Sequence, residues 1–288
     1  MQRLKIGVLA GLTLLTALVW YAIWQEGQRE LTVAFLNVGQ GDAIYIEAPN
    51  GNQLLIDGGR GRAVLRELGA VIPLYDRSID VVLVTHPDAD HIGGLIPVLE
   101  SYRVGAVIES GNERETAVTV GFERAVAQEG ALRVAARRGM RVDLGDGAVF
   151  TILYPDRNVA RVESNEASIV GQLRYGSTTV LLTGDAPASV ERILIAKDGS
   201  GLQSTVLKPG HHGSRSSSVL EFLAAVSPEL AVISAGTGNS YGHPHTEVLA
   251  RLAQLNIRAL RTDMEGRIVL ESDGNRVSVK QPLNAFLP

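Results

Sequence analysis

The chain of 288 residues contains no cysteine. Disulfides, thiolate metal sites and cysteine nucleophiles are therefore excluded, so any metal site must use imidazoles and carboxylates. Aromatic residues make up only 5% of the chain, which gives no clear stacking platform for single-stranded nucleic acids. The net charge of −4 does not indicate a globally basic nucleic-acid binder, although it is compatible with a local basic groove. The 45% hydrophobic content suffices for one large core or two modest ones.

One long stretch near the N-terminus, residues 6–24, carries no charge and is rich in Leu, Val and Ala. Its length suits a bilayer span, and the preceding Arg3 and Lys5 favour a cytoplasmic N-terminus. We therefore expect a cytoplasmic segment 1–5, a transmembrane signal anchor 6–24, a connector 25–30 and an extracytoplasmic domain 31–288. Bulky aromatics occupy the position of a cleavage site, which favours an uncleaved anchor over a removed signal peptide.

Beyond the connector, apolar runs alternate with turn signals. Three successive strands are predicted over residues 31–36, 43–47 and 53–56, separated by Gly- and Pro-containing turns. From residue 63 onward, helical spacing alternates with single apolar runs. Helices are predicted over residues 63–68, 95–100, 120–128, 188–196, 219–226 and 246–255. Strands are predicted over residues 81–85, 104–108, 149–153, 169–173, 179–182, 205–207, 230–233, 268–270 and 277–279. This pattern predicts sheets covered by helices in one layered domain of the α/β (α+β) class.

The segment HPDADH at residues 86–91 places two histidines and two aspartates directly after the apolar run 81–84. These side chains are His86, Asp88, Asp90 and His91. Two imidazoles and two carboxylates so close together can all act as ligands when divalent cations lie between them. Carboxylates beside imidazoles suit zinc, manganese or iron, and Asp88 shifts the preference toward the harder Mn²⁺. The alternative is a polar loop with incidental histidines.

Two further polar segments also follow predicted strands. Asp185, in a Thr-Gly-Asp turn, could bridge two cations, whereas an isolated Gly-Asp turn would be ordinary. The segment KPGHHGS at 208–214 holds His211 and His212, of which one could ligate a metal and the other contact substrate. The candidate phosphate contacts around them are Ser214, Lys208 and Arg215.

The fourth segment, SYGHPH at 240–245, lies between a predicted strand and a predicted helix. His243 could ligate a metal or act as an acid near a leaving group. For His245, a helix cap or a surface position is as good an interpretation. Earlier in the chain, Asp42 and Asp57 lie in glycine-rich turns, where they could support metal ligands or simply stabilise the turns.

Together these segments resemble the metallo-β-lactamase superfamily, in particular the C-terminal hydrolase domains of ComEC-type competence proteins. The resemblance runs from about residue 31 to 279 and implies a four-layer αββα sandwich with a dinuclear site at one edge. The usual first motif of the family is HxHxDH, and Asp88 stands here in place of its second histidine. The family histidine that normally precedes the Gly-Asp strand is also absent, because residues 164–168 read SNEAS.

The resemblance implies two divalent ions, Mn²⁺ or Zn²⁺, with a ligand set of His86, Asp88, Asp90, His91, Asp185 and His211. The choice between His211 and His212 stays open, and Asn165 could support the first ion. The implied catalytic groups are Asp90, His212, His243 and Lys208. The implied substrate contacts are Ser214, Arg215 and Tyr241.

The resulting expectation is a membrane-anchored, extracytoplasmic, metal-dependent phosphodiesterase, acting as a nuclease on DNA. The first alternative is hydrolysis of envelope phosphodiesters such as teichoic acid or phosphocholine. A second is a non-catalytic DNA-binding or assembly module that keeps the fold. β-Lactam hydrolysis is less favoured, because Asp88 and the missing histidine weaken the zinc site that activates lactams.

Overall fold

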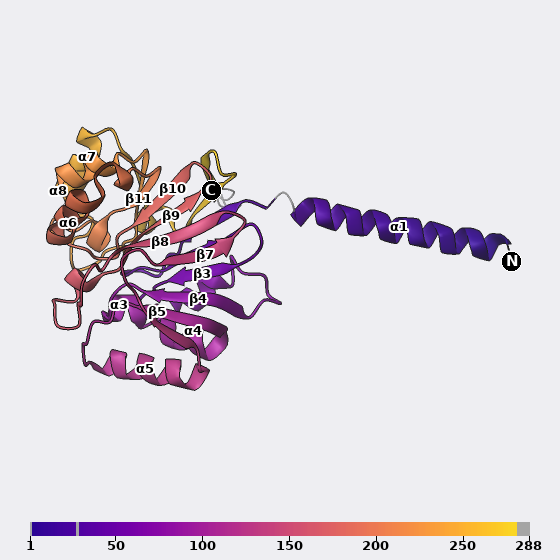
Figure 1. Cartoon of the computed structure of the whole chain (residues 1–288), viewed down its shortest axis with the longest axis horizontal. Coiled ribbons are helices and arrows are strands. Elements are labelled where there is room, and N and C mark those ends of the chain that lie inside the picture. Colours follow the sequence, from indigo (N-terminus) through magenta and orange to yellow (C-terminus); the bar gives the residue numbers. More distant parts are fainter. Residues whose placement is uncertain (1, 27–28, 281–288) are drawn as a thin grey trace.

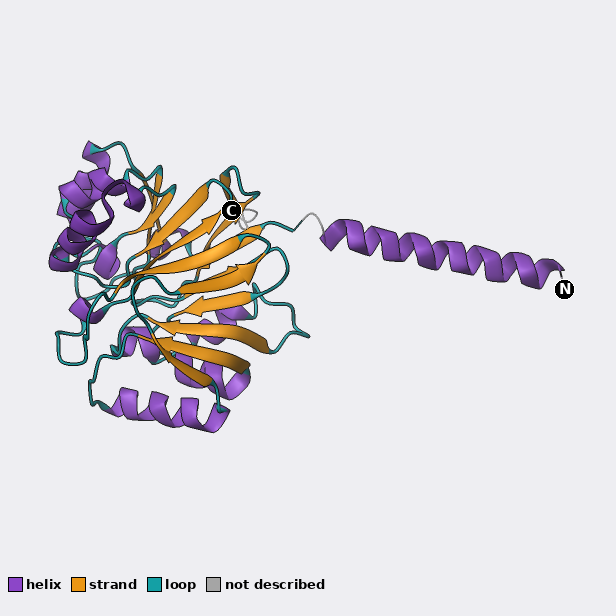
Figure 2. Cartoon of the chain, in the orientation of Figure 1, coloured by secondary structure: helices purple, strands orange, loops and turns teal. Residues whose placement is uncertain are grey.

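The computed structural model describes residues 2–26 and 29–280. Its strands form two mixed sheets that face each other, with helices on both outer sides (Figures 1 and 2). One sheet has eight strands in the order β15-β14-β1-β2-β3-β4-β5-β6. The other has seven in the order β13-β12-β11-β10-β9-β8-β7. The predicted layered arrangement of helices and sheets is therefore confirmed.

The strands of the first sheet are β1 (Leu31–Phe35), β2 (Ile44–Glu47), β3 (Gln53–Ile56), β4 (Ser78–Val84), β5 (Arg103–Glu109), β6 (Leu132–Ala135), β14 (Ile268–Ser272) and β15 (Val277–Lys280). Those of the second are β7 (Arg141–Gly145), β8 (Ala148–Tyr154), β9 (Val170–Tyr175), β10 (Thr178–Leu182), β11 (Val206–Lys208), β12 (Leu230–Ile233) and β13 (Arg258–Arg261). The α-helices are α1 (Gln2–Glu26), α2 (Ala63–Leu68), α3 (Ala89–Ile92), α4 (Leu95–Ser101), α5 (Ala117–Glu129), α6 (Ala188–Asp198), α7 (Leu220–Val226), α8 (Thr246–Gln254) and α9 (Thr262–Glu265).

Three apolar layers hold the sandwich together. The central layer lies between the sheets and includes Phe35 and Phe150. A second layer packs α2, α4 and α5 on the eight-stranded sheet, and a third packs α6, α7 and α8 on the seven-stranded sheet. Because each fully buried large aliphatic or aromatic side chain contributes about 1.5–3 kcal/mol, these layers supply most of the stabilisation.

Parallel pairing sets where the polar segments end up. β3, β4 and β5 are parallel to one another, as are β10, β11, β12 and β13. The carboxyl ends of parallel strands lie at one edge of a sheet, and ligand sites in such sheets form outside that edge. The segments that follow β4, β10, β11 and β12 therefore meet at one edge of the sandwich.

Helix α1 extends away from the sandwich (Figure 1). Its apolar side chains, such as Leu9 and Leu15, are exposed. Among the residues described, no helix combines the length and apolar character that a bilayer crossing demands. The transmembrane segment expected over 6–24, and the anchoring inferred from it, are therefore not supported. Parts of the predicted divisions 1–5, 25–30 and 31–288, namely positions 1, 27–28 and 281–288, lie outside the described residues.

Two strands, β7 and β13, were not predicted from the sequence pattern. Both are outermost strands of the seven-stranded sheet. Each contains arginine, Arg141 in β7 and Arg258 and Arg261 in β13. Edge strands carry charge because it discourages pairing with other chains, and this weakens the apolar alternation by which a strand is predicted.

Candidate metal centre

The histidines and aspartates from the strand-end segments converge on one small volume. The His86 and His91 ring centroids lie 4.0 Å apart, and those of His91 and His212 lie 5.3 Å apart. His86, His91 and Asp185 form one group whose ligand atoms lie within 4.8 Å of one another, and Asp90, His91 and His212 form another. The predicted convergence of these residues is therefore present.

Three ring nitrogens at this centre lack the partners that buried polar atoms normally have. Nε2 of His86, His91 and His212 is buried without a hydrogen bond to any described residue, as is Asp185 Oδ1. The great majority of buried polar groups in proteins are hydrogen-bonded, so orphaned lone pairs call for an explanation. Imidazole nitrogens and carboxylate oxygens grouped in this way fit a divalent cation such as Zn²⁺ or Mn²⁺.

Asp185 occupies the middle of the cluster. Its Oδ2 atom lies 3.4 Å from His91 Nε2, 3.4 Å from His212 Nε2 and 3.8 Å from His211 Nε2. Neighbouring histidines outweigh the effect of burial and hold the pKa of Asp185 well below its usual value. An ionised carboxylate surrounded by ligand atoms is placed where a shared ligand of two cations would lie.

The two adjacent histidines differ in their surroundings. His212 is buried, and its Nε2 lies 3.6 Å from Asp90 Oδ2. The His211 side chain is 28% exposed, and His212 alone of the pair belongs to the close groups of three found among the described residues. Both have left-handed backbones, with φ of 50° and 54°, a strained state that recurs at functional sites. The geometry thus favours His212 as a ligand. It leaves His211 on the solvent-exposed side of the cluster, which is the opening of the site.

Asp57 orients the ring of His91. His91 Nδ1 lies 2.7 Å from Asp57 Oδ2, and Asp57 also accepts hydrogen bonds from the backbone N–H and the hydroxyl of Thr85, at 2.8 and 2.6 Å. Carboxylate contacts of this kind fix the tautomer of a ligating histidine and direct its Nε2 lone pair at the metal. The supporting role of Asp57 stays a prediction, and its contact with His91 is the observation that favours this role over turn stabilisation alone.

Lys208 lies on the protein side of the cluster and does not reach solvent. It is fully buried, its Nζ lies 2.5 Å from Asp42 Oδ2, and it donates to the carbonyl of Gly184 at 2.9 Å. Burial would raise the pKa of Asp42, but Lys208 and His212 lower it to about 2. With its donors committed, Lys208 is placed to support the site and not to contact substrate.

Asp88 accepts hydrogen bonds from two residues whose role at the site the sequence did not indicate. Its Oδ1 accepts hydrogen bonds from Arg114 Nη1 at 2.8 Å and from Ser164 Oγ at 2.6 Å, and its Oδ2 lies 3.9 Å from His86 Nε2. Asn165, the substitute ligand suggested for the first ion, lies beside His211, with 3.5 Å between Nδ2 and Nδ1. Arg114 and Ser164 are 26 and 76 residues from Asp88, and no local motif marks them.

The predicted substrate contacts differ in their exposure and in their partners. Tyr241 is exposed and stacks on His243, with ring centroids 5.7 Å apart. Burial and the neighbouring His211 lower the pKa of His243 to about 4, so its ring is neutral near pH 7. Ser214 is buried and accepts a hydrogen bond from the Ser216 hydroxyl, while Arg215 is exposed and lies 3.5 Å from Glu247.

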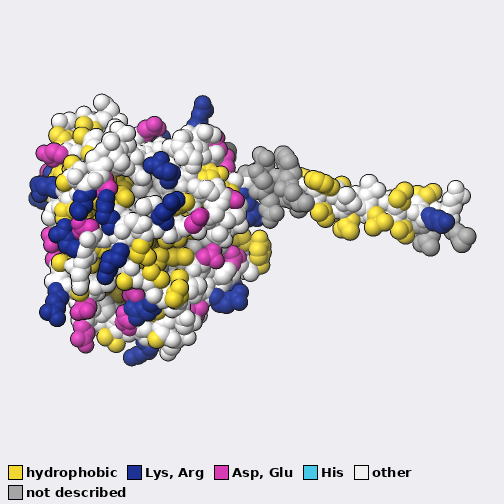
Figure 3. Space-filling view, in the orientation of Figure 1, with side chains coloured by type: hydrophobic (Ala, Val, Ile, Leu, Met, Phe, Trp, Pro, Cys, Tyr) yellow, Lys and Arg dark blue, Asp and Glu magenta, His cyan; other side chains and the backbone are white. Residues whose placement is uncertain are grey.

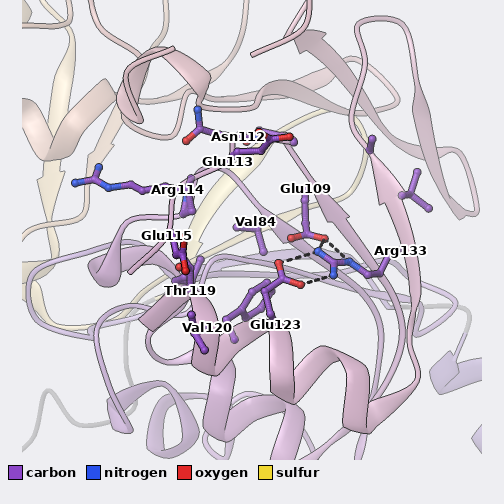
Figure 4. Close-up of a pocket in the computed structure, with 17 residues that line it drawn as sticks. Val84, Glu109, Asn112, Glu113, Arg114, Glu115, Thr119, Val120, Glu123 and Arg133 are labelled. Carbon is purple, nitrogen blue, oxygen red and sulfur yellow. Dashed lines mark hydrogen bonds and ion pairs between the residues drawn. The ribbon is translucent and has the colours of Figure 1, made fainter. Parts of the chain in front are cut away.

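A cavity of about 900 Å³ lies beside the cluster, and no histidine lines it. Its lining includes Pro87 of the segment 86–91. At one end of the cavity Arg133 contacts Glu109 and Glu123 (Figure 4). We place the chemistry at the histidine cluster, because that is where the unpartnered ligand atoms are. On the face shown in Figure 3, acidic and basic side chains are interspersed.

Gly41 lies in the loop between β1 and β2, and its substitution tests how this loop supports the candidate metal centre. A Cβ atom at Gly41 would lie 2.1 Å from the backbone oxygen of Asp90, and φ is +122°. We expect Gly41→Ala to destabilise the protein by about 2–4 kcal/mol and to weaken metal binding by displacing Asp90. Gly39→Ala is the matched control, since φ is +80° but no atom lies within 4 Å, and about 1–2 kcal/mol is expected. If Gly41→Ala and Gly39→Ala lost the same stability in urea unfolding and the same affinity in metal titration, this account would be contradicted.

Metal affinity should depend steeply on pH. Burial lowers the pKa of His212, but Asp185 and Asp42 outweigh it and raise the pKa to about 9. Asp185 and Asp57 likewise raise the pKa of His91 well above its usual value. His212 is thus protonated at pH 7 without metal and must lose its proton to ligate, so affinity should rise about 10-fold per pH unit between pH 6 and 8. Loss of a proton from His91 would make this rise steeper. Calorimetry in buffers of different ionisation enthalpy would count the released protons, and affinity unchanged with pH would refute the prediction.

Comparisons with known proteins agree with this geometry. ComE operon protein 3 of Bacillus subtilis (strain 168) is 30% identical over 87% of this chain and 34% of that protein. Competence protein ComA of Neisseria gonorrhoeae is 33% identical over 88% of this chain and 34% of that protein. The chain thus spans about a third of the length of these relatives.

A solved structure shares the fold. The metallo-beta-lactamase fold protein YhfI from Bacillus subtilis superposes with a TM-score of 0.57 at 12% identity, covering 85% of this chain and all of YhfI. The model of the metallo-beta-lactamase superfamily matches residues 36–237, which include the segments that follow β4, β10 and β11. With its two-sheet sandwich and its buried His/Asp cluster, this chain belongs to the metallo-beta-lactamase superfamily.

Proposed function

We propose that this domain is a metal-dependent phosphodiesterase that cleaves DNA. One observation carries the hydrolase part: three unpartnered histidine Nε2 atoms, from His86, His91 and His212, gather around the Asp185 carboxylate. The DNA part is supported by the similarity to proteins that are named for competence. The oxygen-rich donor set, with Asp88 in place of a histidine, favours phosphoryl chemistry with Mn²⁺ over lactam chemistry with zinc.

The proposal assigns two ions, Mn²⁺ or Zn²⁺, to the cluster. The ligands of the first would be His86, Asp88 and Asp185, and those of the second would be Asp90, His91, His212 and Asp185. When bound, such ions lower the pKa of water and neutralise charge on phosphoryl oxygens. This assignment replaces His211 by His212, because His212 Nε2 lies close to both Asp90 and Asp185.

The side chains at the opening have separate tasks in this proposal. Asp90 is 26% exposed, whereas Asp185 is 4% exposed, so Asp90 can accept a hydrogen bond from an attacking water. His211, also partly exposed, can donate to a phosphate oxygen. The neutral His243 ring would hold the leaving oxygen by a hydrogen bond. Lys208 acts through Asp42 and positions His212.

The test uses the full chain with labelled single- and double-stranded DNA, supplied with Mn²⁺ or Zn²⁺. We expect metal-dependent cleavage that EDTA stops and that Asp90→Ala abolishes without loss of folding. DNA binding without turnover, unchanged in Asp90→Ala, would overturn the enzyme and support a non-catalytic DNA-binding module. Hydrolysis of bis-p-nitrophenyl phosphate without cleavage of DNA would overturn the DNA assignment and favour an envelope phosphodiester.

A further inference from the structure

Arg114 stands out among the charged residues around the centre, because it holds a candidate metal ligand and is still half exposed. Its Nη1 donates to Asp88 Oδ1 at 2.8 Å, and its side chain is 48% exposed. A guanidinium carries five N–H donors, and Nη1 is the Arg114 donor with a hydrogen-bond partner among the described residues. The remaining donors are therefore available at the opening of the site.

The position of Arg114 is built into the fold. Its loop is bonded to the loop that carries Ser164: Asn112 Nδ2 donates to the carbonyls of Val159 and Val162 at 2.7 and 3.1 Å, and Glu113 N–H donates to Ala160 O at 2.8 Å. Ser164, on the second loop, shares Asp88 Oδ1 with Arg114. Two segments far apart in the sequence thus fix one guanidinium beside the cluster.

Arg114 lines the neighbouring cavity, but its side chain does not point into the acidic end of that cavity. In Figure 4 it runs away from the end of the cavity formed by Glu109, Glu123 and Arg133. Arg133 is already neutralised there by two carboxylates. Arg114 shares a single carboxylate, whose second oxygen faces His86. A guanidinium so near a site for divalent cations opposes their binding unless an anion is shared between them.

We propose that Arg114 is a substrate-binding residue for the phosphodiester group. Its free N–H groups hold a non-bridging phosphate oxygen, while Nη1 keeps Asp88 in place with one oxygen toward the metal centre. Arginine suits this double task, because its planar fork bonds two oxygen acceptors at once and lysine offers only a point charge. The inference rests on the proposed function and names a contact for its substrate.

The test compares Arg114→Met and Arg114→Lys with the control Arg124→Met in the full chain. Arg124 is exposed on α5 and has no ion pair within the part of the chain that the structure describes. Binding of a fluorescein-labelled single-stranded oligonucleotide is followed by anisotropy in EDTA over a range of KCl concentrations, so that no turnover occurs. Mn²⁺ affinity is measured separately by calorimetry.

For Arg114→Met we expect weaker oligonucleotide binding and a fall of about 0.7 in the slope of log K against log[KCl], the loss of one phosphate contact. Mn²⁺ affinity should stay equal or rise, because Ser164 still holds Asp88 Oδ1 and a nearby positive charge is gone. Arg114→Lys should restore the slope but not the full affinity. A residue that only props Asp88 in place would instead lower Mn²⁺ affinity and leave the slope unchanged.

Two results would overturn the inference: an unchanged salt slope in Arg114→Met, or no oligonucleotide binding by the unaltered chain. Failure of the proposed function would give a different result from failure of this inference. If the unaltered chain cleaves no phosphodiester with Mn²⁺ or Zn²⁺, but Arg114→Met shows the lower slope, then Arg114 is a phosphate contact in a protein that is not a hydrolase. If cleavage is present and the slope is unchanged, the enzyme stands without this contact.

Discussion

Replacing Asp185 by asparagine is expected to remove hydrolysis of bis-p-nitrophenyl phosphate and most of the bound metal. The amide keeps the shape of the carboxylate but loses the charge that lies 3.4 Å from both His91 Nε2 and His212 Nε2. Changes in residues that merely support metal ligands cost about 10–100-fold, so loss of a ligand shared by two ions should exceed about 100-fold. Metal content by mass spectrometry and initial rates test both effects on one preparation.

Asp143→Asn is the control for this change. Asp143 is exposed on β7, away from the histidine cluster, and its carboxylate accepts a hydrogen bond from the Gly145 N–H. This variant should keep the metal content and rate of the unaltered chain. If Asp185→Asn kept both as well, Asp185 would not be the shared ligand and the assignment of the centre would fail.

Lys208→Met should produce the largest loss of stability among changes near the centre, about 3–5 kcal/mol. The substitution leaves Asp42 buried without the ammonium that lies 2.5 Å from its Oδ2 atom. Lys280→Met is the matched control, because it breaks an exposed pair with Glu271 and should cost about 0–1 kcal/mol. Urea unfolding in EDTA measures both variants without a contribution from bound metal.

A double variant separates the buried charge from lost packing. Adding Asp42→Asn to Lys208→Met removes the orphaned charge and should restore part of the stability, whereas simple additivity of the two losses would refute the pairing. The pH dependence has a definite sign. Because the folded pKa of Asp42 is lowered to about 2, its contribution is present above its ordinary pKa of about 3.9 and is lost as pH falls toward 2. Lys208→Met should weaken that dependence.

Much of the fold could be read from apolar periodicity alone. β3, α2 and β12 have the predicted bounds, and most other elements differ by one to three residues at an end. Interior strands and amphipathic helices bury a strong repeating pattern, so they are visible in the sequence. The edge strands β7 and β13 are not, because half of their pairing and much of their surface face solvent.

The N-terminal segment shows the limit of hydropathy. Residues 6–24 do form part of one helix, α1, as an uncharged apolar run predicts. The prediction of a membrane span went further than the described part of the chain supports.

The sequence by itself determined the kinds of ligand and the strands that carry them. Without cysteine only imidazoles and carboxylates were available, and the parallel strands brought the segments of His86, Asp185 and His212 to one edge. Tertiary structure alone decided that His212 and not His211 turns inward. It also decided that Lys208 forms an ion pair with Asp42 and that Arg114 forms one with Asp88. The reason is physical: spacing fixes where a loop begins, whereas the direction of each side chain depends on backbone angles and on partners far away in the chain.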